Sequence, residues 1–193
     1  DPLTIYVDDQ KKGRGSMGKQ WASSTCGLTF SFSVKMLQDQ HPFIFNMLTT
    51  IAIQNLLFDL DIQASIKYPN DILVKNKKIA GVLTDIINVQ GQKYAVVGIG
   101  LNVNNLTFPQ TIPDGVSLFQ LLLKNTNKEE LFKKLIFNIK DLIKIYINQK
   151  HDIKKLYCEN LQGVNNYVMA LLRGKKVFLR IVDITVQGVL TIQ

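Results

Sequence analysis

The sequence has 193 residues, the size of one domain with at most a small appendage. Apolar residues make up 46% and charged residues 20%, an ordinary globular composition that argues against disorder. No apolar run reaches the roughly eighteen residues that a membrane-spanning helix needs, so we expect no membrane partner. The net charge of +8 lies mostly in residues 101–193. We interpret it as a solvated helix face and do not expect nucleic acid as a partner, because no recognition-helix pattern or aromatic-interleaved groove accompanies it.

The cysteines and histidines are few and scattered. Cys26 and Cys158 lie far apart, and with His41 and His151 they assemble no zinc spacing, so we expect no metal site on the protein. Two reduced thiols without an export signal predict a cytoplasmic location. Asp1, rather than Met, stands first, so we expect the chain to begin inside a longer protein.

The first half of the chain predicts mainly strands. A short apolar run predicts a strand at Leu3–Val7, and alternating apolar residues predict a half-buried strand at Gly27–Val34. Pro42 suits the first turn of a helix that continues to about Leu60. Further strand patterns follow at Ile62–Tyr68, Ile72–Val74, Ile79–Asn88 and Tyr94–Val103, with turns at Asn76 and at Gln90-Gly91.

The second half changes to a helical period and then returns to strands. Helices are predicted at Leu118–Leu123, Lys128–Gln149 and Asp152–Asn160. From Tyr167 onward we expect strands, including Val177–Val182 and Thr185–Ile192, separated by Asp183. Segregated strands and helices favour an α+β fold, a mixed and largely antiparallel sheet backed by helices, followed by a small β module.

A glycine-rich loop at residues 13–21 is the first segment with chemical potential. Gly13, Gly15 and Gly18 allow backbone N–H groups to converge on an anion, and Arg14 adds a two-pronged donor. Gly13 to Lys19 almost matches a P-loop, but Gln20 replaces the Ser or Thr that holds magnesium, and a strand is predicted to follow. A flexible surface loop would explain this segment equally well if it stood alone.

Two further segments contain polar residues beside predicted strands. Lys67-Tyr68-Pro69-Asn70-Asp71 is followed by Lys78, whose amine could face a pocket, and by Gly81, which would let a ligand approach the strand. Gly98-Ile99-Gly100-Leu101-Asn102-Val103-Asn104 lacks the third glycine of a dinucleotide fingerprint. Its glycines suggest close approach by a ligand or a neighbouring backbone.

Taken together, the three segments resemble biotin protein ligase in their order and spacing. The resemblance is carried by Gln10 with Gly13–Trp21, by Lys67–Asp71 with Tyr68 in place of Trp, by Lys78-Ile79-Ala80-Gly81-Val82-Leu83, and by Gly98–Asn104. It implies a catalytic domain like that of class II aminoacyl-tRNA synthetases over residues 1–162 and a partial SH3-like domain over residues 163–193. The family's Ser-Thr-Asn motif, which helps to hold biotin, would be expected before Asp1.

The implied activity is ATP-dependent ligation of biotin to a lysine of a biotin carboxyl carrier domain, through biotinyl-5′-AMP. The resemblance implies catalytic roles for Lys78, Arg14 and Asp71. It implies biotin contacts from Gln10, Gly13, Arg14, Gly15, Ser16, Lys78 and Gly81, and adenylate contacts from Arg14, Trp21, Asn70 and Asn102. Magnesium would arrive with ATP.

Two alternatives remain open at this point. Lipoate or octanoate ligation would use the same fold, but its Arg-Arg-x-Ser-Gly-Gly-Gly motif is absent. A non-catalytic basic binding module would keep the fold without the chemistry. A homodimer is a possible assembly.

Overall fold

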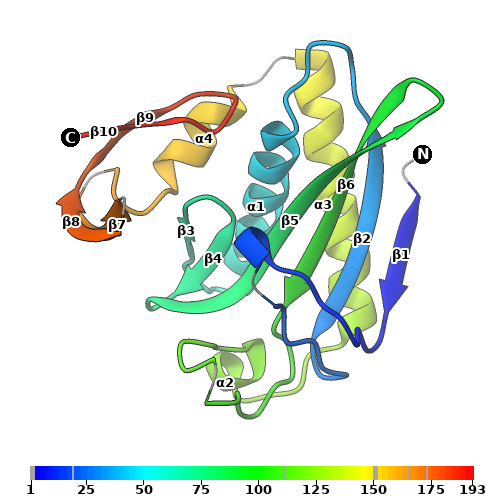
Figure 1. Ribbon diagram of the computed structural model, residues 1–193. Helices are drawn as coiled ribbons and strands as arrows, with labels where there is room; N and C mark the ends of the chain where they lie inside the picture. The colour runs from blue at the N-terminus through cyan, green and yellow to red at the C-terminus, as the bar shows by residue number, and fades with distance from the viewer. Residues whose placement is uncertain (1–2, 19, 111, 150–151, 165, 173) are drawn as a thin grey trace.

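An antiparallel sheet of six strands forms the centre of the computed structural model, which describes residues 3–18, 20–110, 112–149, 152–164, 166–172 and 174–193 (Figure 1). Lys19, part of the near P-loop, and His151 lie outside the described residues. The strand order is β1-β2-β6-β5-β4-β3, and every neighbouring pair is antiparallel. The strands are β1 (Thr4–Val7), β2 (Leu28–Lys35), β3 (Ser65–Lys67), β4 (Asp71–Val74), β5 (Lys77–Val89) and β6 (Gln92–Leu101).

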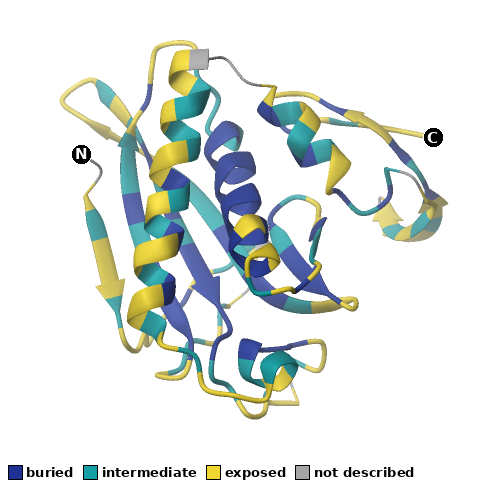
Figure 2. Ribbon diagram, turned by 180° about the vertical axis from the view of Figure 1, so that it is seen from behind, coloured by how far each residue is buried: buried dark blue, intermediate teal, exposed yellow. Residues whose placement is uncertain are grey.

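Alternation along the strands gives the sheet one apolar face and one more polar face. In β2 the side chains of Leu28, Phe30 and Phe32 are buried, as their spacing predicts. Two helices cover this face, α1 (Phe43–Phe58) directly and α3 (Lys128–Gln149) beside it (Figure 2). The opposite face of the sheet stays free for a site.

The two helices differ in how deeply they are buried. Thirteen of the sixteen residues of α1 are buried, so this helix is buried almost all round rather than along one stripe. Helix α3 has the predicted bounds and buries a stripe that includes Leu131, Leu135 and Ile139, while its basic face is exposed. The positive charge of this segment is therefore a solvated helix face.

Two tight turns join the central strands where the sequence predicts them. Lys75 and Asn76 have φ values of 49° and 62° between β4 and β5, and Gln90 and Gly91 have φ values of 51° and 83° between β5 and β6. Positive φ at both central residues matches the twist of a β-hairpin. The predicted strand at Ile62–Tyr68 is shorter than expected, because only Ser65–Lys67 pairs with β4.

After β6 the chain passes through helix α2 (Leu118–Leu122), which begins with a capping box formed by Ser117 and Gln120. Beyond α3 comes α4 (Ile153–Glu159), capped by the Asp152 side chain. The chain then forms β7 (Val168–Leu172), β8 (Lys175–Leu179), β9 (Ile181–Ile184) and β10 (Leu190–Ile192), which pair as β7 with β8 and β9 with β10.

The prediction that Asp183 separates the last two strands is wrong. Asp183 lies inside β9, and the chain reverses at Thr185–Gly188, where Gly188 has a φ of 84°. A glycine with positive φ is the usual residue of such a turn, so Gly188 was the better signal. The α+β class itself is confirmed. Within the described residues, no helix is both long enough and apolar enough to span a membrane.

Candidate active site

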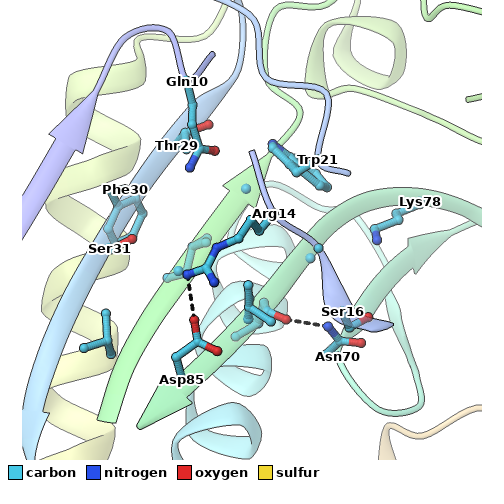
Figure 3. Close-up of a pocket in the computed structure, with 18 residues that line it drawn as sticks. Gln10, Arg14, Ser16, Trp21, Thr29, Phe30, Ser31, Asn70, Lys78 and Asp85 are labelled. Carbon is cyan, nitrogen blue, oxygen red and sulfur yellow. Dashed lines mark hydrogen bonds and ion pairs between the residues drawn. The ribbon is translucent and has the colours of Figure 1, made fainter. Parts of the chain in front are cut away.

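A cavity lies on the polar face of the sheet, beneath the loop that connects β1 to β2 (Figure 3). Strands β2, β5 and β6 form its floor, and Gln10, Arg14, Gly15, Ser16 and Trp21 of the loop form its roof. The space inside it that a water-sized sphere can reach is about 120 Å³, and the cavity opens to solvent at its mouth. The cavity is lined by Gln10, Arg14, Gly15, Ser16, Trp21, Thr29, Phe30, Ser31, Asn70, Lys78, Gly81, Val82, Leu83, Asp85, Val96, Gly98, Ile99 and Gly100.

Lys78 and Asp71 form an ion pair at one end of the cavity. The Lys78 Nζ atom lies 2.5 Å from Asp71 Oδ1, and about a third of the Lys78 side chain and a quarter of the Asp71 side chain are exposed. Lys78 stands at the start of β5 and Asp71 at the start of β4, two antiparallel neighbours. A partly buried ammonium at a cavity wall is suited to binding an anionic ligand.

Gly81 makes room for this pair. A Cβ atom at residue 81 would lie 3.2 Å from both Cε and Nζ of Lys78 and 3.5 Å from Asp71 Oδ1. The sequence suggested that Gly81 admits a ligand to the strand. In the structure Gly81 lines the cavity, and the lysine side chain itself occupies the space above it.

Trp21 forms the wall between this cavity and a second one. Its ring lies on Gly100, where an added Cβ would approach the indole atoms to between 2.2 and 2.6 Å. The Lys78 ammonium lies 5.5 Å from the Trp21 ring centroid, a cation–π distance. Gly100 in β6 thus allows the Trp21 side chain of the roof to lie directly against the strand.

The roof is a short hairpin rather than a P-loop. The Trp21 N–H donates to the Gly13 carbonyl at 3.0 Å, and the backbones of Arg14 and Gln20 form an antiparallel β-bridge across the loop. Ser16–Gly18 forms one 3₁₀ turn at its tip, and the strand β2 follows, as the sequence predicted. Gly13 is required at the closure, since a Cβ there would lie 2.3 Å from the Trp21 carbonyl oxygen.

Arg14 reaches across the cavity to Asp85. Its Nη2 atom donates to Asp85 Oδ2 at 2.9 Å, in a pair whose side chains are 78% and 46% exposed. Figure 3 shows the guanidinium over the strands that form the cavity floor. An exposed pair of this kind contributes about 0–1 kcal/mol, so an incoming anion can displace Asp85 at small cost.

Asn70 and Asn102, both expected on the adenylate side, form structural hydrogen bonds. The side-chain amide of Asn70 donates to the Val82 backbone carbonyl, and the backbone carbonyl of Asn70 accepts the Val82 N–H at 3.0 Å. The Asn102 amide nitrogen donates to the Lys78 and Val116 carbonyls at 3.2 and 3.1 Å. Both hydrogens of the Asn102 amide are therefore committed to the backbone that positions Lys78.

The remaining predicted residues line the roof side of the cavity. Gln10, Gly15 and Ser16 belong to it, and Figure 3 places Ser16 near Asn70 at the end where Lys78 enters. The structure therefore brings all predicted site residues to one region. Gly13 and Asn102 lie just outside the first cavity, Gly13 in the loop closure and Asn102 beneath Lys78.

Sequence reasoning missed Asp85, Leu83 and Ser31. Residues 81, 83 and 85 of β5 share one face of the strand, as do Thr29 and Ser31 of β2. Continuing this period of two from Gly81 would have found Leu83 and Asp85. In β2, polar Ser31 alternates with buried Phe30 and Phe32, so the same period of two would have placed Ser31 on the face with the cavity.

A second, more apolar cavity lies on the other side of Trp21. Its lining includes Trp21 and Lys78, which it shares with the first cavity, together with Ser23, Ser24, Asn102, Asn105, Thr107, Phe108 and Pro109. The two cavities therefore meet at the Lys78 ammonium. This arrangement suits a ligand in two parts whose charged junction lies at Lys78.

Residues 1–104 match the sequence model of the Biotin/lipoate A/B protein ligase family. A structure of biotin protein ligase from Aquifex aeolicus in complex with biotin and ATP superposes with a TM-score of 0.81 at 26% identity, covering 97% of this chain and 80% of that one. The bifunctional ligase/repressor BirA of Bacillus subtilis (strain 168) is 31% identical over 114 residues, 57% of this chain and 34% of its own length. The biotin–[acetyl-CoA-carboxylase] ligase of Mycobacterium tuberculosis is 26% identical over 145 residues, 70% of this chain and 52% of its own length. The chain thus spans between a third and about half of the length of these two curated relatives.

Proposed function

This chain belongs to the biotin/lipoate A/B protein ligase family, and from that premise we propose that it is a biotin–protein ligase. It activates biotin with ATP to biotinyl-5′-AMP and then transfers biotin to a lysine of a biotin carboxyl carrier domain. The observation that carries the proposal is the Lys78 ammonium, which lies at the junction of two cavities beside Asp71 and Trp21.

The first step joins two anions. A biotin carboxylate oxygen bonds to the α-phosphorus of ATP, the bond from that phosphorus to the bridging oxygen breaks, and pyrophosphate leaves. Lys78 offsets the repulsion between carboxylate and phosphate and stabilises the charge that develops between them. Arg14, released from Asp85, adds a two-pronged contact to the same oxygens.

The two cavities divide the adenylate between them. The cavity over β5 and β6, with Leu83, Val96 and the glycines, holds the biotinyl group beneath Gln10, Gly15 and Ser16. The more apolar cavity beyond Trp21 holds the adenosine. Gly13 contributes by leaving space for the closure of the loop against Trp21, and Gly81 by leaving space for the Lys78 side chain.

The second step transfers the acyl group to the carrier. The neutral amine of the carrier lysine attacks the acyl carbon, AMP leaves with the bonding electrons, and the amine loses a proton. Asp71 lies close enough to Lys78 to orient an incoming amine in the same place. The name of the Mycobacterium tuberculosis relative supports a carboxylase carrier domain as partner.

ATP enters as its magnesium complex, so the metal is part of the substrate. The described residues contain no group of three His, Cys, Asp or Glu side chains that could hold a metal ion. Arg14 and Lys78 supply the cationic charge that the chain itself brings to the phosphate. Free Cys26 and Cys158 suit a reducing compartment, and we place the reaction in the cytoplasm.

Incubation of the protein with biotin, MgATP and an unmodified carrier domain tests the proposal. The expected product is a carrier with one acid-stable biotinyl-lysine, which intact mass and peptide mapping detect. Lipoate in place of biotin is the matched substrate control and should give no product. Labelling of the carrier by lipoate but not by biotin would overturn the proposal, as would pyrophosphate release that does not depend on biotin.

A further inference from the structure

The hydroxyl of Tyr68 links the site to the C-terminal β strands. Tyr68 Oη donates to the Gly188 carbonyl at 2.7 Å, across 120 residues of sequence. Tyr68 immediately precedes the Pro69-Asn70-Asp71 turn, and Gly188 lies in the turn between β9 and β10. In Figure 1 this hairpin extends along the side of the molecule where β3 and β4 lie.

Phe43, the first residue of α1, fills the space around this hydrogen bond. Its ring centroid lies 6.3 Å from that of Tyr68 and 5.8 Å from that of Tyr157. A Cβ at residue 188 would approach the Phe43 ring to 2.9 Å, so the hairpin turn packs directly on the ring. Three separate segments therefore meet at Tyr68.

The same junction fixes the backbone of the catalytic turn. The Pro69 carbonyl accepts hydrogen bonds from Asn46 of α1 at 2.6 Å and from the hydroxyl of Tyr157 of α4 at 2.7 Å. The next residue, Asn70, exchanges hydrogen bonds with Val82 of β5. A continuous set of contacts thus runs from Gly188 through Tyr68 to Asp71 and its partner Lys78.

We propose that Tyr68 is a positioning residue through which the β9–β10 hairpin holds the Pro69-Asn70-Asp71 turn in register with Lys78. It does not touch substrate and acts through Asp71. Tyr68 stands where the motif of the resembled family has Trp, and tyrosine is the aromatic residue that places a hydroxyl donor at the far end of its ring. The kinetic part of this inference rests on the proposed function.

Both phenols remain donors over the physiological pH range. Burial raises the pKa of Tyr68 above its ordinary value, and burial is also the main reason that the pKa of Tyr157 is raised far above it. The two hydroxyls therefore keep their protons at physiological pH, and both can donate hydrogen bonds there.

Hydrogen exchange in Tyr68→Phe tests the connection without any need for enzyme activity. The Val82 amide, which donates to Asn70, should lose about five-fold in protection, the factor that one ordinary neutral hydrogen bond is worth. Amides in the middle of α3, around Leu135, should keep theirs. Tyr167→Phe is the matched control, since it removes the hydroxyl of a tyrosine that is 60% exposed, and should leave both regions unchanged.

Steady-state adenylation by the same variants gives the kinetic readout. In Tyr68→Phe the kcat for pyrophosphate release should fall several-fold while the KM for biotin changes less than about two-fold, because the Asp71–Lys78 geometry matters most in the transition state. Unchanged Val82 protection, or an equal loss at Val82 and Leu135, would overturn the inference. A local loss at Val82 in a protein whose wild type shows no adenylation would overturn the proposed function and leave the positioning role standing.

Discussion

Replacing Gly100 with Ala should disable the site by displacing Trp21. The new methyl group would lie 2.2 Å from Cε2, 2.4 Å from Cζ2 and 2.6 Å from Nε1 of the indole, whereas carbon atoms in contact normally lie about 3.5–4.0 Å apart. The ring must therefore move away by more than about 1 Å. Because Trp21 lines both cavities and faces the Lys78 ammonium, this shift changes the position where, in the function proposed above, biotin and ATP meet.

The expected loss is about 10²-fold in the rate of adenylation, the typical cost of a 1 Å misplacement in an active site. Overpacking should also lower the free energy of unfolding by about 1–3 kcal/mol. Gly98→Ala, on the same strand and face, is the matched control for stability and for the Trp21 environment, but not for the adenylation rate, because Gly98 lines the cavity proposed for biotin. Its methyl group would meet Ser31 Oγ at 3.5 Å, an ordinary contact, so stability should be unchanged or rise by about 0.5 kcal/mol.

Trp21 is the only tryptophan, so its fluorescence reports the displacement directly. The emission spectrum should shift in Gly100→Ala and stay unchanged in Gly98→Ala, while pyrophosphate release measures the rate. Wild-type emission and wild-type adenylation in Gly100→Ala would refute the reasoning, because they would show that the indole does not need to rest on β6.

Four further changes test other parts of the site and the fold. Lys78→Ala should reduce adenylation by roughly 10²–10³-fold and biotin affinity by less, measured by pyrophosphate release and equilibrium binding. Arg14→Ala should speed adenylate dissociation more than it weakens ATP binding, with partial rescue by Arg14→Lys, in a chase of labelled adenylate. Ser16→Arg should lengthen adenylate retention several-fold in that chase, because a charged hydrogen bond exceeds a neutral one by about 1 kcal/mol. Lys154 holds the pKa of Asp183 below its ordinary value through a hydrogen bond, so the contribution of this pair to stability is present above the ordinary aspartate pKa and is lost as pH falls through the lowered one. Lys154→Met should flatten this acid limb in unfolding measured against pH.

Local patterns predicted most of the fold because they determine most of it. The alternation of Leu28, Phe30 and Phe32 and the helical stripe of Lys128–Gln149 are set by burial of one face, so both elements lie where expected. Gln90-Gly91 supplies positive φ at the turn that the sequence indicated. The prediction failed where pairing depends on distant partners: most of Ile62–Tyr68 finds no neighbouring strand.

The site was predictable where a motif spans neighbouring strands. Asp71 and Lys78 are only seven positions apart on two strands joined by a tight turn, so their approach could be expected. Arg14 and Asp85 are 71 positions apart, and their contact depends on how the roof hairpin folds over the sheet. Likewise, nothing local indicates that Tyr68 bonds to Gly188.

The position of Lys78 explains why no single motif specifies the site. Its N–H donates to the Asp114 carbonyl at 2.6 Å, and its own carbonyl accepts from the Val116 N–H at 3.0 Å and from the Asn102 amide at 3.2 Å. The neighbouring strand β4 and segments that follow the sheet therefore fix its backbone, while Asp71 fixes its ammonium. A cation held in this way needs little rearrangement when charge develops on a phosphate, and such preorganisation is the main source of electrostatic catalysis. The catalytic power that we assign to Lys78 is thus a property of the folded sheet and its flanking loops rather than of the Lys-x-Ala-Gly sequence alone.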